Sequence, residues 1–157
     1  MNRTIATIGY EGSLIDDFVA ALRRVSIDLL IDVRDLPLSR KKGFSKNQLS
    51  AALTAAGIEY VHLRGLGDPR AGRQAARAGN YREFLTIFGR HMKTEAALRD
   101  MDIAAELVRA RRACLMCFEC NHARCHRSIV ADRLAKITQL TVTPLTVHDA
   151  DVGRVAA

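Results

Sequence analysis

Short apolar runs with strand character alternate with amphipathic helical patterns along almost the whole chain, and this alternation constrains the fold most. The clearest run is Leu29-Leu30-Ile31-Asp32-Val33, which is apolar enough to be buried on both faces of a parallel sheet. Segments with the 3.6-residue apolar period of a helix separate such runs. We therefore expect a single α/β domain with a mostly parallel sheet of about five strands and helices on both faces. The expected strands are residues 4–8, 29–33, 58–63, 114–118 and 141–147.

Length and composition agree with one globular domain. The chain has 157 residues, of which 48% are hydrophobic and 26% are charged, as is typical of soluble proteins. We expect the domain to span residues 1–149, followed by a short tail, residues 150–157. No apolar run approaches the roughly 20 residues that cross a bilayer, and the N-terminus lacks the apolar core of a signal peptide. We therefore expect a cytoplasmic protein with no membrane association.

Positive charge is concentrated in one stretch of the chain. Lys and Arg outnumber Asp and Glu by 24 to 17, which gives a net charge of +7. Residues 34–82 hold ten of the basic residues and only three acidic ones. A local positive field favours anionic partners such as nucleotides or nucleic acid; the alternative is a solvated, arginine-rich surface. Residues 64–79 have few large apolar side chains, so we interpret them as a surface arm or lid. The nucleic-acid contacts expected on this arm are Arg70, Arg73 and Arg77.

The loops that follow the expected strands share one edge of the sheet, because the carboxyl ends of parallel strands meet there and form the ligand site of such folds. These loops are residues 10–13, 34–45, 64–80 and 119–127. Asp32 and Arg34 point the same way along their strand, and a buried aspartate needs a partner such as this arginine. The pair could also serve only to hold the loops. The anion-binding residues expected at this edge are Tyr10, Arg34, Arg40 and Arg127.

The segment from Cys114 to His126 contains four cysteines in a pattern similar to metal-ligand spacing. In a cytoplasmic chain, thiols or metal ligands are expected rather than disulfides. Strand alternation places Cys114 and Cys117 on opposite faces of the sheet, so Cys114 is expected in the core. No cofactor is expected in the preferred interpretation. The alternative is a zinc protein with the ligands Cys117, Cys120, Cys125 and a histidine, either His122 or His126.

The preferred interpretation of the same loop is thiol chemistry at Cys125. A loop that leads from a strand into a helix points backbone N–H groups at the helix start and forms an anion site. Cys125 lies there between Arg124, His126 and Arg127, an electropositive setting that lowers a thiol pKa. Glu119 shares the face of Cys117 and could accept or donate a proton. We expect Cys125, Glu119 and His126 to be catalytic. The alternative is a structural thiol, with Arg127 paired to Asp32 or Glu119.

Several motifs occur together along most of the chain. They are Thr7-Ile8-Gly9-Tyr10, Leu30-Ile31-Asp32-Val33-Arg34, Pro37, Ser39-Arg40, Phe44, Gly57-Ile58-Glu59-Tyr60, Leu66-Gly67, Leu115-Met116-Cys117-Phe118-Glu119 and Cys125-His126-Arg127. As a set, from Thr7 to about His148, they resemble the bacterial family catalogued as domain of unknown function 488. The resemblance implies an α/β fold and a site at these motifs, without an established activity. Its pattern features Cys117, Glu119, Cys125, His126 and Arg127, whereas Cys114, Cys120 and His122 look like additions.

A fainter similarity is to rhodanese and related phosphatase domains. Ile31-Asp32-Val33-Arg34 and Cys125-His126-Arg127-Ser128 resemble their strand and cysteine loop. The chain departs from them in the shorter spacing between Cys125 and Arg127. The sequence thus favours a Cys/His/Arg anion site that acts on or binds a phosphate-containing ligand, a nucleotide or nucleic acid. The alternatives are a nucleic-acid-binding module without catalysis and the zinc protein.

Overall fold

The computed structural model describes residues 3–121 and 125–147, which form one α/β domain around a five-stranded parallel sheet. The strands lie in the order β3-β2-β4-β1-β5, and every neighbouring pair is parallel. This arrangement confirms the fold class expected from the sequence. The expected tail, residues 150–157, lies outside the described residues. The strands are β1 (Thr4–Gly9), β2 (Leu29–Asp32), β3 (Glu59–His62), β4 (Ala113–Cys117) and β5 (Thr141–Leu145).

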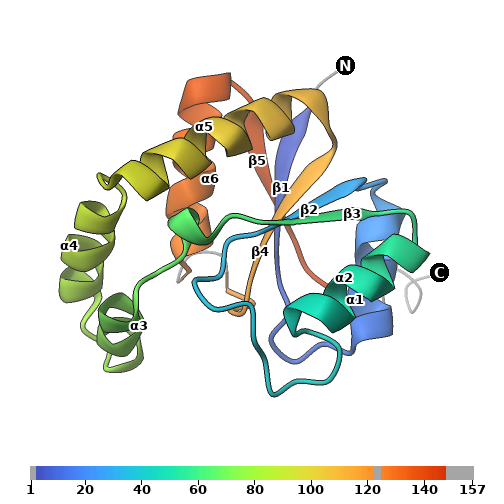
Figure 1. Ribbon diagram of the computed structural model, residues 1–157, viewed down its shortest axis with the longest axis horizontal. Coiled ribbons are helices and arrows are strands. Elements are labelled where there is room, and N and C mark those ends of the chain that lie inside the picture. Colours follow the sequence, from blue (N-terminus) through green and yellow to red (C-terminus); the bar gives the residue numbers. More distant parts are fainter. Residues whose placement is uncertain (1–2, 122–124, 148–157) are drawn as a thin grey trace, which may run out of the picture.

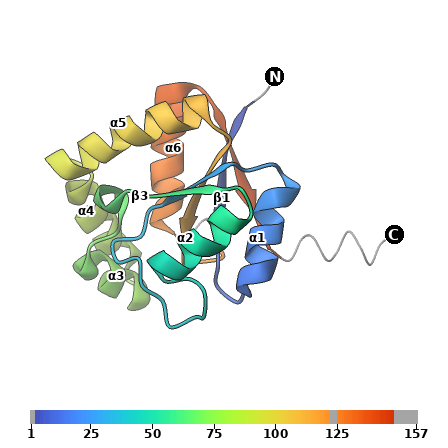
Figure 2. The same ribbon diagram turned by 45° about the vertical axis from the view of Figure 1, so that its right-hand side comes forward.

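Helices cover both faces of the sheet (Figures 1 and 2). On one face, α1 (Ile15–Arg24) and α2 (Lys46–Ala55) bury Phe18, Leu22, Leu49 and Leu53 in a core with Ile8 and Met116. On the other face, α4 (Tyr81–His91), α5 (Glu95–Ala110) and α6 (His126–Thr138) build a second core around Ile31 and Leu115. None of the helices among the described residues is long and apolar enough to cross a membrane.

The segment interpreted as a surface arm is packed onto the domain instead. It forms the short 3₁₀ helix η1 (Arg64–Leu66) and the helix α3 (Arg70–Arg77), which lies against α4 (Figure 1). Leu66 and Ala75 belong to the core beneath α5 and α4, with exposed fractions of 0% and 6%. A few small or single apolar residues are therefore enough to anchor the segment, because α4 supplies the rest of the apolar surface.

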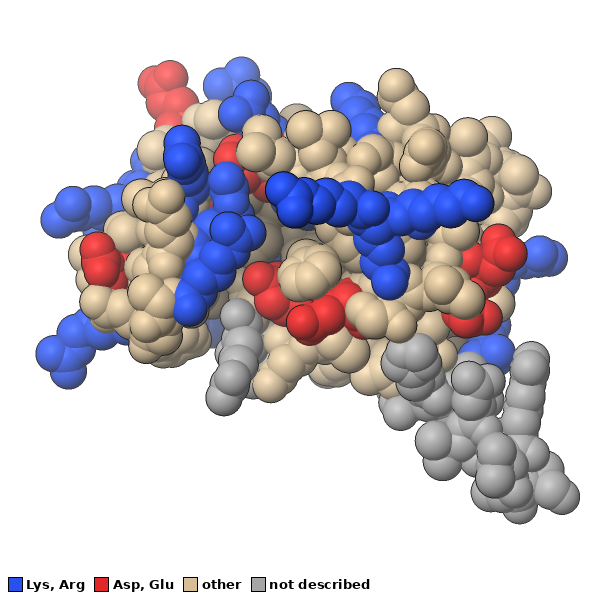
Figure 3. Space-filling model, turned by 90° about the horizontal axis from the view of Figure 1, so that it is seen from below, with Lys and Arg blue, Asp and Glu red and all other residues tan. Residues whose placement is uncertain are grey.

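All strands run the same way, so the loops that follow them share one edge of the sheet. In Figure 1, β1 and β4 run from the top of the view toward its lower side, while β2 and β3 run across it. Figure 3 looks at the molecule from that side and therefore faces the loops that follow the strands. This carboxyl edge holds the candidate site.

Candidate functional site

A disulfide between Cys117 and Cys125 occupies the carboxyl edge. Cys117 is the last residue of β4, and Cys125 is the N-cap of α6. Both are buried in the core under α4, α5 and α6, whereas Cys114 is a free thiol in the core on the opposite face. The prediction from strand alternation, that Cys114 lies in the core on the face opposite Cys117, is therefore confirmed. The expectation of thiols or metal ligands rather than a disulfide is wrong for Cys117 and Cys125, because the loop after β4 returns to the start of α6 and brings the two sulfurs together.

The side chain of Glu119 lies against this disulfide. Its Oε2 atom is 3.2 Å from Cys125 Sγ and 3.5 Å from Cys117 Sγ. Burial raises the pKa of Glu119, and the nearby charges of Arg127 and Arg77 only partly oppose this effect. A carboxyl with a raised pKa, in contact with two sulfurs, can hold a proton that a leaving thiolate needs.

The imidazole of His126 has a defined tautomer. Its Nε2 atom lies 2.7 Å from the carbonyl oxygen of Val33, and a carbonyl can only accept, so Nε2 carries the proton. Burial lowers the pKa of His126 to about 4, which keeps the ring neutral at physiological pH. The unprotonated Nδ1 therefore presents a lone pair, and it lies 3.6 Å from Cys125 Sγ. This nitrogen can accept a hydrogen bond from the Cys125 thiol, or it can bind a metal ion.

Arg127 is fully buried and holds the loop that leads from β4 to α6, the cysteine loop, in place at Glu119 and Cys120. Its guanidinium donates to the backbone carbonyl of Glu119, to that of Cys120 at 3.3 Å and to Cys117 Sγ at 3.0 Å. Burial lowers the pKa of Arg127. The sequence-based alternative paired Arg127 with Asp32 or Glu119. Arg127 instead contacts the backbone carbonyl of Glu119, and Asp32 pairs with Arg34. An anionic ligand that bound Arg127 would have to replace these acceptors or use Nε, which has no partner among the described residues.

Gly9 makes this packing possible, although the sequence analysis named it only within the motif Thr7-Ile8-Gly9-Tyr10. A Cβ atom at Gly9 would overlap the carbonyl of Glu119 and lie 2.8 Å from Arg127 Nη1. The backbone of β1 also continues alongside the loop, since the N–H of Glu11 donates to the carbonyl of Phe118 at 2.9 Å. The position of Gly9 at the end of a strand, within one of the family-like motifs, was the available signal.

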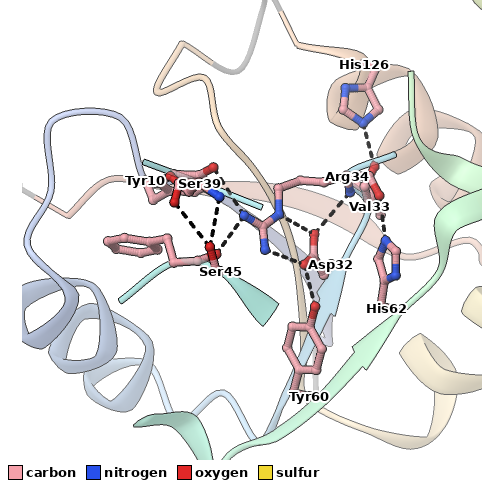
Figure 4. Close-up of polar contacts among 10 residues, drawn as sticks. Tyr10, Asp32, Val33, Arg34, Ser39, Ser45, Tyr60, His62 and His126 are labelled. Atoms are coloured by element: carbon pink, nitrogen blue, oxygen red, sulfur yellow. Dashed lines mark hydrogen bonds and ion pairs between the residues drawn. The ribbon is translucent and has the colours of Figure 1, made fainter. Parts of the chain in front are cut away.

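A second polar network lies on the other face of the sheet and centres on Arg34 (Figure 4). Arg34 forms an ion pair with Asp32 at 2.7 Å and donates to Tyr10 Oη at 3.2 Å and to the carbonyl of Phe44 at 2.8 Å. Tyr60 Oη donates to Asp32 at 2.6 Å. Although burial lowers the pKa of Arg34, the hydrogen bonds and charge of Asp32 raise it overall. The expected Asp32–Arg34 pair is therefore present, and it connects the loops after β1 and β2.

The two networks meet at the backbone directly after β2. The carbonyl of Val33 faces His126, and the carbonyl of Arg34 lies 2.7 Å from His62 Nε2 (Figure 4). Arg34, Glu119, Cys125 and Arg127 thus share the carboxyl edge, as the parallel topology predicts. The side chain of Arg34, however, packs with Tyr10 and Phe44 in the core opposite Cys117 and Cys125.

The basic residues expected to contact nucleic acid differ in exposure. Arg70 and Arg77 are exposed, as is Arg40 in the loop after β2. Arg73 is largely covered, because it pairs with Asp35 at 2.9 Å and donates to the carbonyl of Asp68 at 2.8 Å. Figure 3 shows Lys and Arg side chains along two sides of the carboxyl edge, around a central group of acidic ones.

Asp68 is a buried acid that sequence reasoning did not single out. Its side chain is 5% exposed, and its Oδ1 has no hydrogen-bond partner within residues 3–121 and 125–147. Burial raises the pKa of Asp68 to about 7; the charge of Arg73 lowers it, while the charges of Glu119 and Asp35 raise it further. The only signal in the sequence was its position before Pro69, in a segment expected to be exposed.

The zinc ligands suggested by the sequence are only partly brought together. Cys117 Sγ, Cys125 Sγ and a ring nitrogen of His126 lie within 4.8 Å of one another. Cys120 is outside this group, and His122 lies outside the described residues. The histidine named as the second option, His126, is therefore the one that joins the two cysteines.

Comparison with known proteins identifies a family but no characterised relative. No curated protein and no solved structure matches the chain. The sequence model of one family matches residues 14–134, which include the Asp32–Arg34 motif and the whole cysteine loop. The chain therefore belongs to the family described as Domain of unknown function DUF488.

Proposed function

We propose that the protein is a thiol–disulfide redox protein in which Cys117 and Cys125 cycle between a disulfide and two thiols. The observation that carries the proposal is the carboxyl of Glu119, which lies within 3.5 Å of both sulfurs. A disulfide that serves only as a cross-link has no use for a half-buried acid with a raised pKa beside it. A disulfide that exchanges needs a group that supplies and removes protons.

In this proposal Cys125 is the exchanging cysteine and Cys117 is the resolving one. The thiolate of an external dithiol attacks Cys125 Sγ, and the S–S bond breaks with Cys117 as the leaving thiolate. Arg127 Nη1, 3.0 Å from Cys117 Sγ, stabilises that thiolate, and Glu119 can protonate it. The second thiol of the external dithiol then displaces Cys125. The protein gains two electrons and two protons, and the external dithiol becomes a disulfide.

The position of Cys125 supports its role as the nucleophile in the reverse direction. It caps the start of α6, where the backbone N–H of Arg127 lies 3.5 Å from its sulfur. Helix N-termini stabilise thiolates. The neutral Nδ1 of His126 can accept a hydrogen bond from the Cys125 thiol. A cytoplasmic location, which we expect from the sequence, favours a transient rather than a permanent disulfide.

A second candidate function is the binding of a phosphate-containing ligand, a nucleotide or nucleic acid, at the same edge. The exposed basic residues Arg40, Arg70 and Arg77 favour it, because they stand on the loops and helix that surround the cysteine centre. Arg34 and Arg127 contribute to the positive field of this edge, but apart from Arg127 Nε their guanidinium groups already donate to acceptors within the protein. In this candidate, the basic residues position an anionic partner, with or without thiol chemistry.

Trapping a mixed disulfide tests the redox function. The variant Cys117→Ser leaves Cys125 without its resolving partner, so incubation with oxidised glutathione should attach one glutathione at Cys125. The matched variant Cys125→Ser should accept little glutathione at Cys117, and the fold of each variant is checked by circular dichroism. Folded Cys117→Ser protein that forms no mixed disulfide at Cys125 would contradict the proposal.

A further inference from the structure

We infer that the reduced form of this centre binds a zinc-type divalent cation through Cys117 Sγ, Cys125 Sγ and His126 Nδ1. The inference rests on the proposed redox function, because both sulfurs must be released from the disulfide before they can bind a metal ion. The same centre would then exist in two exclusive states, an oxidised disulfide without metal and a dithiolate that holds the ion.

The spacing of the three ligand atoms fits this assignment. They come from the end of β4 and the first turn of α6 and lie within 4.8 Å of one another. Zinc bonds of about 2.0–2.3 Å in a tetrahedron require ligand atoms roughly 3–4 Å apart. The observed limit of 4.8 Å is already close to such distances. All three residues are buried, so the protein supplies a shell that shields the ion from water.

The tautomer of His126 is the one that a metal ligand needs. The Nε2–H group donates to the Val33 carbonyl at 2.7 Å, which leaves the Nδ1 lone pair directed toward Cys125. Metal-binding histidines typically hold their second nitrogen in this way, on a backbone carbonyl or a carboxylate. The ring is also fixed by edge contact with Phe88, whose centroid is 5.6 Å away. The ligand nitrogen is therefore already oriented in the metal-free state.

Charge balance favours the same conclusion. Two thiolates and the Glu119 carboxylate would bring three negative charges into a buried space, which is costly without partners. A divalent cation together with the Arg127 guanidinium compensates them, and Arg127 already donates to Cys117 Sγ. Glu119 Oε2, within 3.5 Å of both sulfurs, stands where it can complete the coordination. The chemical softness of the ligand atoms also favours zinc, because thiolate and imidazole ligands select zinc over magnesium or calcium.

Oxidation would release the ion. A disulfide of the oxidised-glutathione type takes two electrons from the two protein thiolates and two protons from water and becomes two thiols, while the two protein sulfurs join as the Cys117–Cys125 disulfide. The bound cation then loses two of its ligands and leaves. Metal binding would thus protect the dithiol form, and the cation and the oxidant would compete for the same sulfurs.

Cobalt substitution on the reduced full-length protein tests the inference. The protein is reduced under anaerobic conditions, freed of reductant, and one portion is alkylated to establish that Cys117 and Cys125 are free thiols. A second portion is titrated with Co²⁺ and then Zn²⁺. We expect a thiolate-to-cobalt charge-transfer band and tetrahedral d–d bands, which zinc abolishes. The oxidised protein should show neither, and added oxidised glutathione should release zinc to a chromogenic chelator.

Variants assign the ligands. Cys117→Ser, Cys125→Ser and His126→Gln should each weaken zinc binding at least tenfold, while Cys114→Ser and Cys120→Ser should leave it unchanged. If a ligand variant does not fold, the wild-type comparison of reduced and oxidised protein decides the question alone. Free thiols at Cys117 and Cys125 without cobalt bands or zinc retention would overturn the metal inference and leave the redox function standing. Failure of both cysteines to be reduced in the folded protein would overturn the redox function itself.

Discussion

The imidazole Nε2 of His126 lies 2.7 Å from the backbone carbonyl of Val33, and this bond ties the first turn of α6 to the end of β2. The two residues are far apart in the sequence but adjacent at the carboxyl edge. The bond leaves the Nδ1 lone pair of His126 facing Cys125. It also fixes the orientation of the imidazole on the same chain segment that carries Asp32 and Arg34. The cysteine loop and the Arg34 network are thus built on the two faces of one strand end.

Gly9→Ala should strongly destabilise the protein. The new Cβ would overlap the Glu119 carbonyl and crowd Arg127 Nη1, and neither can move without disturbing the disulfide loop. We expect a loss of roughly 3 kcal/mol or more in the free energy of unfolding, measured by urea denaturation. Gly89→Ala is the control, since it lies within α4 with nothing within 4 Å of its Cβ position; it should stabilise by roughly 0.5–1 kcal/mol. Equal effects of the two variants would refute the packing described for Gly9.

Asp32→Ala should leave the charge of Arg34 buried without its partner. Arg34 is 6% exposed and Asp32 is 0% exposed, so we expect a loss of about 3–5 kcal/mol in the free energy of unfolding. Asp28→Ala removes the exposed partner of Arg111 and should cost less than about 1 kcal/mol. Chemical denaturation of both variants checks the difference. A cost for Asp32→Ala no larger than that of Asp28→Ala would show that the buried network adds no stability.

Asp68 should make stability depend on pH. Its folded pKa of about 7 is higher than that of an unfolded aspartate, so the native state binds the proton more tightly. Its stabilising contribution is therefore complete below about pH 4 and is lost as the pH rises toward 7, by up to about 4 kcal/mol. Asp68→Asn should flatten this part of the pH profile of the free energy of unfolding. The exposed control Asp102→Asn should keep the wild-type profile, and an unchanged slope in Asp68→Asn would contradict the buried, protonated carboxyl.

The basic residues at the carboxyl edge should bind polyanions electrostatically. The double variant of Arg70 and Arg77 to alanine should reduce the slope of log K against log salt on duplex DNA by about 2, from roughly 0.9 per lost phosphate contact. Arg73 is left in place because it pairs with Asp35. The control replaces Arg23 and Arg24, exposed residues at the end of α1. Binding that is absent at low salt, or equally reduced by the control, would reject the nucleic-acid candidate.

The parallel sheet could be predicted from the sequence because its signal is local. Residues 114–118 are apolar throughout and residues 29–33 are apolar except for Asp32, and the intervening helices repeat their apolar residues every 3.6 positions. Strand alternation also separated Cys114 from Cys117. The shared edge of Arg34 and Cys125 followed from topology alone, since parallel strands place their following loops together.

The pairing of Cys117 with Cys125 could not be predicted in the same way. It depends on how the loop after β4 turns back, and that turn is set by contacts between Arg127, Gly9 and the backbone of Glu119 that are distant in sequence. Alternation along β2 and the residues after it predicted the face on which Arg34 lies. It could not predict the partners Tyr10 and Phe44, because they come from other loops. The burial of Asp68 was hidden for a different reason: Gly72, four residues further along its own segment, leaves room for the Asp68 carboxyl directly against α3.

A redox titration of the folded protein tests the central claim most directly. The protein is equilibrated with mixtures of reduced and oxidised glutathione, quenched by alkylation, and its free cysteines are mapped by mass spectrometry while circular dichroism follows the fold. We predict that Cys117 and Cys125 become alkylated together, in one two-electron transition, with the fold intact, while buried Cys114 stays unmodified. A Cys117–Cys125 disulfide that opens only when the protein unfolds, or two thiols that never pair at any ratio, would contradict the account.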